Sequence, residues 1–206
     1  MAKEGSTFFA ILSRMKYIER WALMRNQRSE NLSEHSLEVA MIAHALCLIG
    51  NVRYGKKLHA ERAALIGMCL DASEIITGDM PTPVKYYNED LRDAYKMVES
   101  AAEQKLLGQL PEDLKPFYKD LLSPSVAKAE DDADRYLRRL VKAADKLSAL
   151  LKCIEERRSG NEEFSTAERT IEESVNQMRK ELPEVDDFVK EFLPSYGNTL
   201  DQLLGR

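Results

Sequence analysis

Apolar residues recur every three or four positions along most of the chain, which is the period of an amphipathic helix. The first such helix is expected from Ser6 or Thr7, either of which can cap it, to about Arg20. Its apolar face comprises Phe8, Ile11, Leu12, Met15 and Ile18. We find no alternation of apolar and polar residues typical of a strand. The pattern therefore predicts an all-α fold.

Capping and helix-breaking residues predict where the later helices begin and end. The expected ranges are about 33–49, 59–76, 88–108, 111–122 and 130–158, then a helix from Ser165 or Thr166, and a last one over 183–192. Pro81 and Pro83 should keep the segment after the third range non-helical. We expect one domain over 1–206, with the motif-bearing core at about 8–160 and C-terminal helices in 161–206.

Composition narrows the class of protein. The chain has 206 residues, of which 44% are hydrophobic and 32% charged, a mixture typical of a soluble globular protein. A net charge of −5 argues against a nucleic-acid polymer as partner, although a few basic side chains can still bind a small phosphate. No stretch approaches the roughly 20 apolar residues of a membrane span, and no signal peptide is recognisable. We expect a cytoplasmic protein without a membrane partner.

The three cysteines, Cys47, Cys69 and Cys153, lie in apolar helical stretches without the spacing of a metal site. We expect three buried thiols in a reducing compartment.

Ionisable side chains on apolar helix faces are the candidates for chemistry. His35 shares a face with Val39, Ile42 and Leu46, whereas His44 lies about 180° away at 100° per residue. Taken alone, a histidine facing the core is either a hydrogen-bonded structural residue or a metal ligand.

Asp71 and Glu74 end the most apolar helix of the chain, which we expect to be buried nearly all round. They lie three residues apart and should project together. Buried carboxylates near a helix C-terminus are unfavourable unless paired or bound to a metal, so their positions favour a functional role. Asp145 borders the apolar stripe of a later helix, where it is either a further ligand or a surface partner of Lys142 or Lys146.

One histidine and two aspartates from three helices suit a divalent cation with mixed nitrogen and oxygen ligands. A neighbouring glutamate could then move a proton, and metal-activated hydrolysis is the chemistry that such a set performs.

The order of these residues resembles the HD-domain metal-dependent phosphohydrolases, and in particular the bacterial 5'-deoxynucleotidase branch. The motifs that carry the resemblance are Arg20-Trp21, Glu34-His35-Ser36, Asp71-Ala72-Ser73-Glu74, Thr77-Gly78-Asp79 with Pro81-Thr82-Pro83, and the later Asp145. They lie within residues 8–160. The resemblance implies an HD-type helical bundle that hydrolyses 2'-deoxynucleoside 5'-monophosphates to deoxynucleoside and phosphate, usually as a homodimer.

The resemblance also implies a role for each motif residue. His35, Asp71 and Asp145 correspond to ligands of a divalent cation such as Co²⁺ or Mn²⁺, and Glu74 to the catalytic acid or base. Arg20 would orient the phosphate, with Trp21 and Asp71 also holding the substrate. The nucleotide-contacting segment corresponds to Asp79, Met80, Pro81 and Thr82, with Asp79 near the sugar.

One position departs from the family pattern. The family places a histidine directly before the first aspartate ligand, and this chain has Leu70 there, which has no donor atom. His59 would lie about 16 Å away along the helix, and Cys69 is rotated by about 100°. We therefore expect three protein ligands, weaker metal binding and weakened hydrolysis. The alternatives are a nucleotide-binding relative without catalysis, or a hydrolase of another small phosphate ester.

Overall fold

The computed structural model describes residues 5–85, 87–123, 129 and 131–205, and in these residues all regular structure is helical. The α-helices are α1 Phe8–Leu12, α2 Leu32–Tyr54, α3 Ala60–Cys69, α4 Glu74–Thr77, α5 Thr82–Lys85, α6 Glu89–Leu107, α7 Lys115–Leu122, α8 Asp132–Arg158, α9 Ser165–Glu181, α10 Pro183–Glu191 and α11 Leu200–Leu203. Short 3₁₀ helices lie at Ser13–Tyr17, Glu162–Phe164 and Leu193–Ser195. The predicted all-α class is confirmed.

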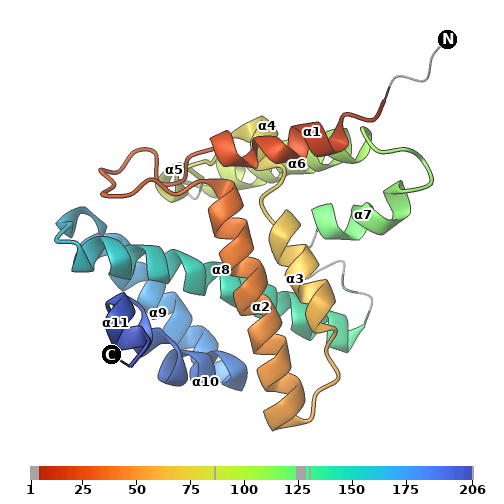
Figure 1. Cartoon of the computed structure of the whole chain (residues 1–206). Helices are drawn as coiled ribbons and strands as arrows, with labels where there is room; N and C mark the ends of the chain where they lie inside the picture. Colours follow the sequence, from red (N-terminus) through yellow and green to blue (C-terminus); the bar gives the residue numbers. More distant parts are fainter. Residues whose placement is uncertain (1–4, 86, 124–128, 130, 206) are drawn as a thin grey trace.

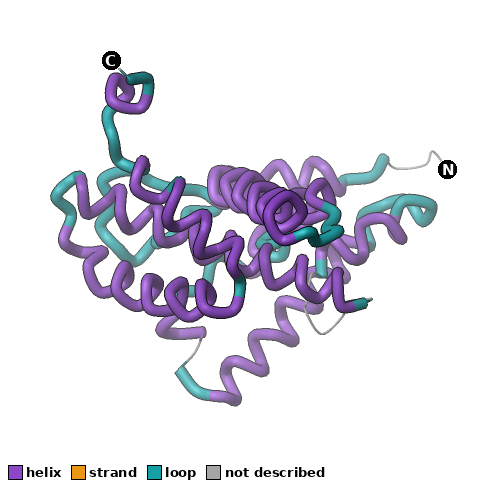
Figure 2. Tube along the Cα trace, turned by 90° about the horizontal axis from the view of Figure 1, so that it is seen from below, coloured by secondary structure: helices purple, strands orange, loops and turns teal. Residues whose placement is uncertain are grey.

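The long helices α2 and α8 cross at the centre of the molecule, with α3 lying beside α2 (Figure 1). The main hydrophobic core fills the space between these three helices and is extended by α9 and α10. A smaller cluster around Phe8, Cys69 and Leu106 joins α1 and α6 to the end of α3. In the view from below, helices joined by loops make up most of the described chain (Figure 2). The end of α3 therefore lies where the two clusters meet.

Helix α2 is defined by its two caps. The Asn31 side chain accepts hydrogen bonds from the backbone N–H groups of Ser33 and Glu34, and the Glu34 carboxylate accepts one from the Asn31 N–H. This capping box places the start at Leu32, one residue before the predicted start at about 33. The helix continues to Tyr54 and ends at Gly55, whose φ of +64° suits glycine.

Gly50 was expected to stop this helix but lies inside it. A Cβ added there would be 2.8 Å from a carboxylate oxygen of Glu184 on α10. Gly67 of α3 has a similar role, because its Cβ would lie 3.0 Å from the Ala40 backbone. These glycines allow close helix packing rather than ending helices.

Several other predicted boundaries were wrong. The first helix ends at Leu12 and tightens into a 3₁₀ turn to Tyr17. The third ends at Cys69, and a turn separates it from the short α4. Pro83 lies in the first turn of α5, which tolerates proline, so the segment after Gly78 is partly helical. The fifth helix begins at Lys115 rather than Pro111, and α8 begins at Asp132 after an Asp131 cap. The predicted start at Glu130 lies outside the described residues.

The outer surface of α2 and α3 is more apolar than expected. Leu65 and Met68 of α3 are 49% and 44% exposed, so this helix is not buried all round. Helix α2 has the length and apolar composition of a membrane span, contrary to the prediction that no stretch does, although 56% of that window is buried inside the fold. Burial in the core therefore accounts for about half of this apolar window, and the remainder forms an exposed apolar surface.

The three cysteines are free and buried, as predicted. Burial raises the pKa of the Cys47 and Cys153 thiols to about 12 and that of Cys69 to about 11. They are therefore packing residues rather than nucleophiles.

Candidate metal and nucleotide site

Three predicted donors from separate segments meet where α2, α8 and the turn after α3 come together. His35 closes the first turn of α2 and is 1% exposed. Its Nε2 is 3.2 Å from Asp145 Oδ1 on α8 and 3.4 Å from Asp71 Oδ2. One donor atom from each of the three residues lies within 4.8 Å of the other two. An imidazole nitrogen and two carboxylate oxygens at this spacing fit a divalent cation, although they supply only three protein ligands.

The two aspartates have opposite electrostatic surroundings. Burial raises the pKa of Asp71, and the charges of Asp145 and Asp79 add to this effect while His35 and Arg20 oppose it. Burial also opposes ionisation of Asp145, but the His35 imidazole and the Lys146 ammonium hold the pKa of that carboxyl well below its usual range. Lys146 Nζ lies 3.6 Å from Asp145, so Asp145 contacts both His35 and a surface lysine. Two carboxylates facing one imidazole leave negative charge that a cation would neutralise.

The sequence pattern predicted that Asp71 and Glu74 lie on one continuous helix. In the structure they do not. Asp71 lies in the turn after α3, and Glu74 is the first residue of α4. The two residues still lie one turn apart, because the Glu74 N–H donates a hydrogen bond to the Asp71 carbonyl at 3.0 Å. Asp71 directly follows the C-cap residue of α3, where the helix dipole disfavours a negative charge, so its carboxylate depends on its contact with His35.

Glu74 has a strongly raised pKa. Burial, together with the nearby charges of Asp71 and Asp79, raises the pKa of Glu74 to about 9. In the metal-free protein, this carboxyl keeps its proton at neutral pH. A carboxyl of this kind can donate a proton to a leaving oxygen.

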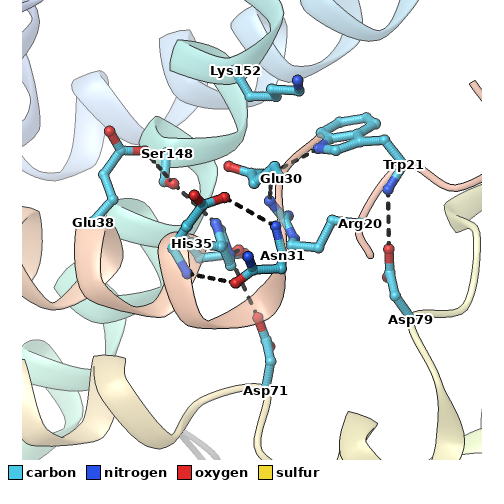
Figure 3. A network of polar contacts seen from close by, with 12 residues as sticks. Arg20, Trp21, Glu30, Asn31, His35, Glu38, Asp71, Asp79, Ser148 and Lys152 are labelled. Atoms are coloured by element: carbon cyan, nitrogen blue, oxygen red, sulfur yellow. Dashed lines mark hydrogen bonds and ion pairs between the residues drawn. The ribbon is translucent and has the colours of Figure 1, made fainter. Parts of the chain in front are cut away.

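Arg20 lies in the segment before α2 and contacts Glu30. Its Nη1 is 2.5 Å from Glu30 Oε2, and the Trp21 indole N–H donates to the same oxygen at 3.1 Å (Figure 3). Arg20 also lies over the Trp21 ring, 5.6 Å from its centroid. Glu30 therefore fixes the guanidinium and the indole relative to one another.

Trp21 has the only positive φ of a non-glycine residue in the described chain, at 58°. A bulky side chain rarely adopts this backbone conformation, so surrounding contacts must hold it. Asp79 Oδ2 accepts a hydrogen bond from the Trp21 backbone N–H at 3.3 Å, and the ring packs on Phe164. Asp79, predicted to lie near the sugar, thus also links its own loop to the Arg20–Trp21 segment.

The remainder of the predicted nucleotide segment follows directly. Met80 and Pro81 are half-buried, whereas Thr82 is exposed and begins α5. The Pro81 carbonyl accepts backbone hydrogen bonds from Val84 and Lys85, which fixes the loop against α5. Within the described chain, only Asp79 of this segment acts on a metal donor, through its charge on Asp71.

Leu70 is the last residue before the turn that carries Asp71. Its backbone is helical, and its side chain is partly buried against the main hydrophobic core. The ligand position of the family pattern is therefore filled by a packing residue.

Three further residues of the site were not predicted from the sequence. Glu30 binds Arg20 and Trp21, whereas Ser148 and Glu38 lie behind His35. Sequence spacing could have revealed Ser148 and Glu38. Glu38 follows His35 by three residues and Ser148 follows Asp145 by three, so each lies one helical turn beyond a ligand.

A buried ion pair anchors the loop that follows Arg20 and Trp21. Glu156 accepts hydrogen bonds from the backbone N–H groups of Gln27 and Arg28, and pairs with Lys152. Burial opposes ionisation of Glu156, but its bonds to Lys152, Gln27 and Asn161 lower its pKa to about 2. The carboxylate therefore stays charged and fixes the loop.

Comparison with known proteins shows the family. Residues 7–196 match the family described as 5'-deoxynucleotidase YfbR-like. The chain belongs to the YfbR-like 5'-deoxynucleotidase family. A 5'-deoxynucleotidase of Vibrio atlanticus is 48% identical over 198 residues, covering 96% of this chain and 98% of that protein. The 5'-deoxynucleotidase YfbR of Salmonella paratyphi B is 47% identical, covering 96% of each.

Solved structures show the same fold. An HD-domain phosphohydrolase from Listeria innocua superposes with a TM-score of 0.76 at 24% identity, covering 92% of this chain and 88% of that one. The HD phosphohydrolase DatZ of cyanophage S-2L, solved with dA and one catalytic Zn²⁺, gives a TM-score of 0.62 at 19% identity and covers 92% of this chain and 96% of that one. The predicted family and HD-domain fold are therefore confirmed.

Proposed function

We propose that this chain hydrolyses 2'-deoxynucleoside 5'-monophosphates to deoxynucleoside and phosphate. The observation that carries the proposal is the convergence of His35 Nε2 with one oxygen each of Asp71 and Asp145, all within 4.8 Å. Membership of the 5'-deoxynucleotidase family supports this choice of substrate.

His35, Asp71 and Asp145 would hold the divalent cation, for which Mn²⁺, Co²⁺ and Zn²⁺ all suit a mixed nitrogen and oxygen donor set. When bound, such a cation supplies Lewis-acid polarisation of the phosphate and makes water a better nucleophile near neutral pH. Because Leu70 adds no ligand, we expect weaker metal binding than with four protein ligands.

Arg20 and Trp21 would hold the nucleotide. A guanidinium presents a planar fork of N–H donors that fits phosphate oxygens. Its contact with Glu30 and the Trp21 ring keeps it oriented before substrate arrives. The indole, held in place by Phe164 and Glu30, offers an aromatic wall for the nucleoside.

Glu74 would move the proton that the reaction requires. Breaking the bond between phosphorus and the 5'-oxygen leaves an alkoxide, which needs a proton to depart as the deoxynucleoside. Glu74 lies beside Asp71 in the turn and holds a proton at neutral pH in the metal-free protein. It can therefore supply this proton as general acid.

Asp79 would select the sugar. Its loop is fixed by the hydrogen bond to Trp21 and by the Pro81 turn, so the carboxylate is held in place. A fixed carboxylate near the sugar can exclude a 2'-hydroxyl or accept a hydrogen bond from a 3'-hydroxyl. Met80, Pro81 and Thr82 continue the same segment and would contribute to nucleotide contact.

The test is phosphate release from dAMP and AMP by metal-stripped protein, with and without added Mn²⁺ or Co²⁺. The proposal predicts release that requires metal and is faster with dAMP. Binding of dAMP without release at full metal occupancy would instead establish a nucleotide-binding relative. Rapid release from unrelated phosphate esters, with none from dAMP, would establish a different hydrolase.

A second copy of this chain is the proposed protein partner. Helices α2 and α3 lie side by side, and their outer face exposes apolar side chains, namely Leu37, Met41, Leu48, Val52, Leu65 and Met68. From Val39 to Val52 helix α2 has no Asp, Glu, Lys or Arg. An uncharged apolar face can pair with itself across a twofold axis without charge repulsion, which favours a homodimer.

The assembly is tested by sedimentation of the full chain and of the Met41→Glu variant. We expect a dimer for the unmodified chain and a monomer for the variant, because an isologous interface would place two glutamates in an apolar contact. A monomeric unmodified chain at micromolar concentration would refute the homodimer.

The compartment is proposed to be the cytoplasm. Three free, buried thiols support a reducing environment.

A further inference from the structure

His35 has a second contact on the side of its ring that faces away from the aspartates. Its Nδ1 lies 2.9 Å from Ser148 Oγ on α8, and both side chains are buried. The Ser148 hydroxyl in turn lies 2.6 Å from Glu38 Oε2 on α2 and donates to it. Figure 3 shows Ser148 between Glu38 and His35.

The hydrogen atoms in this line can be assigned by counting donors. Burial raises the pKa of Glu38 above its ordinary value, and the hydrogen bond from Ser148 opposes this shift. With Glu38 ionised, its carboxylate has no proton to donate, so the single hydroxyl proton of Ser148 points to Glu38. Only lone pairs of Oγ then remain for His35, and Nδ1 must carry the proton that joins them. The other ring nitrogen, Nε2, faces Asp71 and Asp145 and is the one left to present a lone pair to a cation bound between them.

We propose that Ser148 and Glu38 are positioning residues that hold His35 in the Nδ1-protonated form, with Nε2 directed to the cation. The inference rests on the proposed metal site and extends it to two residues with no contact to metal or substrate. Metal-ligating histidines commonly use the second ring nitrogen in this way, and loss of such a partner weakens metal binding by roughly 10–100-fold.

The arrangement also explains why two helices, α2 and α8, each contribute two side chains to the site. His35 and Glu38 lie one turn apart on α2, and Asp145 and Ser148 lie one turn apart on α8. Each helix therefore contributes one residue that faces the proposed cation and one that lies behind the imidazole. With only three protein ligands, we expect the orientation of the single nitrogen donor to matter more than it would in a fuller set.

The first experiment compares Zn²⁺ affinity of the full chain with that of Ser148→Ala and Glu38→Gln. We expect each variant to bind Zn²⁺ about tenfold more weakly, because alanine removes the acceptor and a glutamine amide can donate to Ser148 and relax the constraint. Ser36→Ala is the matched control. Ser36 is also a buried serine on α2, and its hydroxyl has no partner among the described residues, so its loss should leave Zn²⁺ affinity unchanged.

The second experiment is ¹⁵N NMR of histidine-labelled protein at pH 8, metal-free and with Zn²⁺. We expect a slowly exchanging proton on His35 Nδ1 in the unmodified chain and in Ser36→Ala, and faster exchange in Ser148→Ala. The proposal is overturned by an unprotonated Nδ1 in the Zn²⁺ form, or by variants that bind Zn²⁺ within twofold of the unmodified chain. Failure of the unmodified chain to bind Zn²⁺ would refute the metal site itself, and the metal-free spectrum would still decide between the two hydrogen-bond directions.

Discussion

Asp79 combines two tasks that substitutions can separate. Its Oδ2 holds the backbone of Trp21 in a left-handed conformation, and the proposed function places its carboxylate against the sugar. Asp79→Asn keeps an acceptor oxygen for the Trp21 N–H but removes the negative charge, whereas Asp79→Ala removes both. We expect both variants to narrow the ratio of dAMP to AMP turnover, and only the alanine variant to weaken nucleotide binding overall.

Measured kcat/KM for both nucleotides checks this expectation. If the ratio stays the same in both variants, Asp79 has no role in selecting the sugar.

Glu74 should make the stability of the metal-free chain depend on pH. Its pKa is about 9 in the folded chain, against an ordinary value near 4.5. The folded state therefore binds the proton more tightly, and this contribution to stability is full below about pH 4.5 and is lost as pH rises towards 9. Glu74→Gln stays uncharged, so it should unfold at a temperature higher than the unmodified chain by a few degrees at pH 8.5, but not at pH 4.5.

The same variant should reduce phosphate release by roughly 100-fold or more, because it cannot supply a proton. Thermal unfolding at the two pH values and phosphate release from dAMP are the measurements. Loss of dAMP binding together with activity would assign Glu74 a structural role instead.

Leu70→His tests whether the departure from the family pattern limits the site. The imidazole would add a nitrogen donor next to Asp71, and we expect metal affinity to rise by roughly 10-fold or more, with faster phosphate release. In the metal-free chain the same change should cost about 1–3 kcal/mol, because Leu70 packs against the core and a buried imidazole would be left unsatisfied.

Metal content, phosphate release and denaturant unfolding check these expectations. A chain that already binds metal tightly and turns over rapidly with Leu70 in place would contradict them.

Among the helices, the capping box of α2 has the most direct influence on the site, because His35 lies in the turn that follows it. Asn31→Ala removes the acceptor for two N–H groups and should destabilise the chain by about 1 kcal/mol. It should also weaken metal binding, since fraying would displace His35.

Asn88→Ala is the matched control. Asn88 caps α6 by accepting from the Leu91 N–H, in a helix that carries no metal donor. We expect a similar loss of stability with metal affinity unchanged. Equal effects of the two variants on metal affinity would show that the α2 cap has no special role in metal binding.

The helices also show what periodicity could and could not predict. The central parts of α2, α3, α6 and α8 follow from apolar spacing, and so does the placement of His35 on the core face. The ends were less predictable because they depend on tertiary contacts. Gly50 lies within α2 since α10 packs closely against it, and the turn at Asp71 is fixed by its meeting with α2 and α8.

The residues of the candidate site likewise divide into those that the sequence predicted and those that it did not. The sequence motifs predict which residues would touch metal or nucleotide, and the structure brings His35, Asp71 and Asp145 close together. Glu30, Glu38 and Ser148 were missed because their importance depends on partners distant in the sequence. Trp21 was predicted to hold the substrate, but its left-handed backbone could not be predicted from the residue type.

In the molecule as a whole, the core formed by α2, α3 and α8 serves to bring three donors from distant segments to one point. The central claim is that this point holds one divalent cation on which hydrolysis depends. The most direct measurement is a titration of metal-stripped chain with Mn²⁺ in which bound metal and phosphate release from dAMP are recorded together. We predict that release is absent without metal, rises in proportion to occupancy and levels off at one ion per chain. Release at the full rate from the metal-free chain, or no release at full occupancy, would contradict the claim.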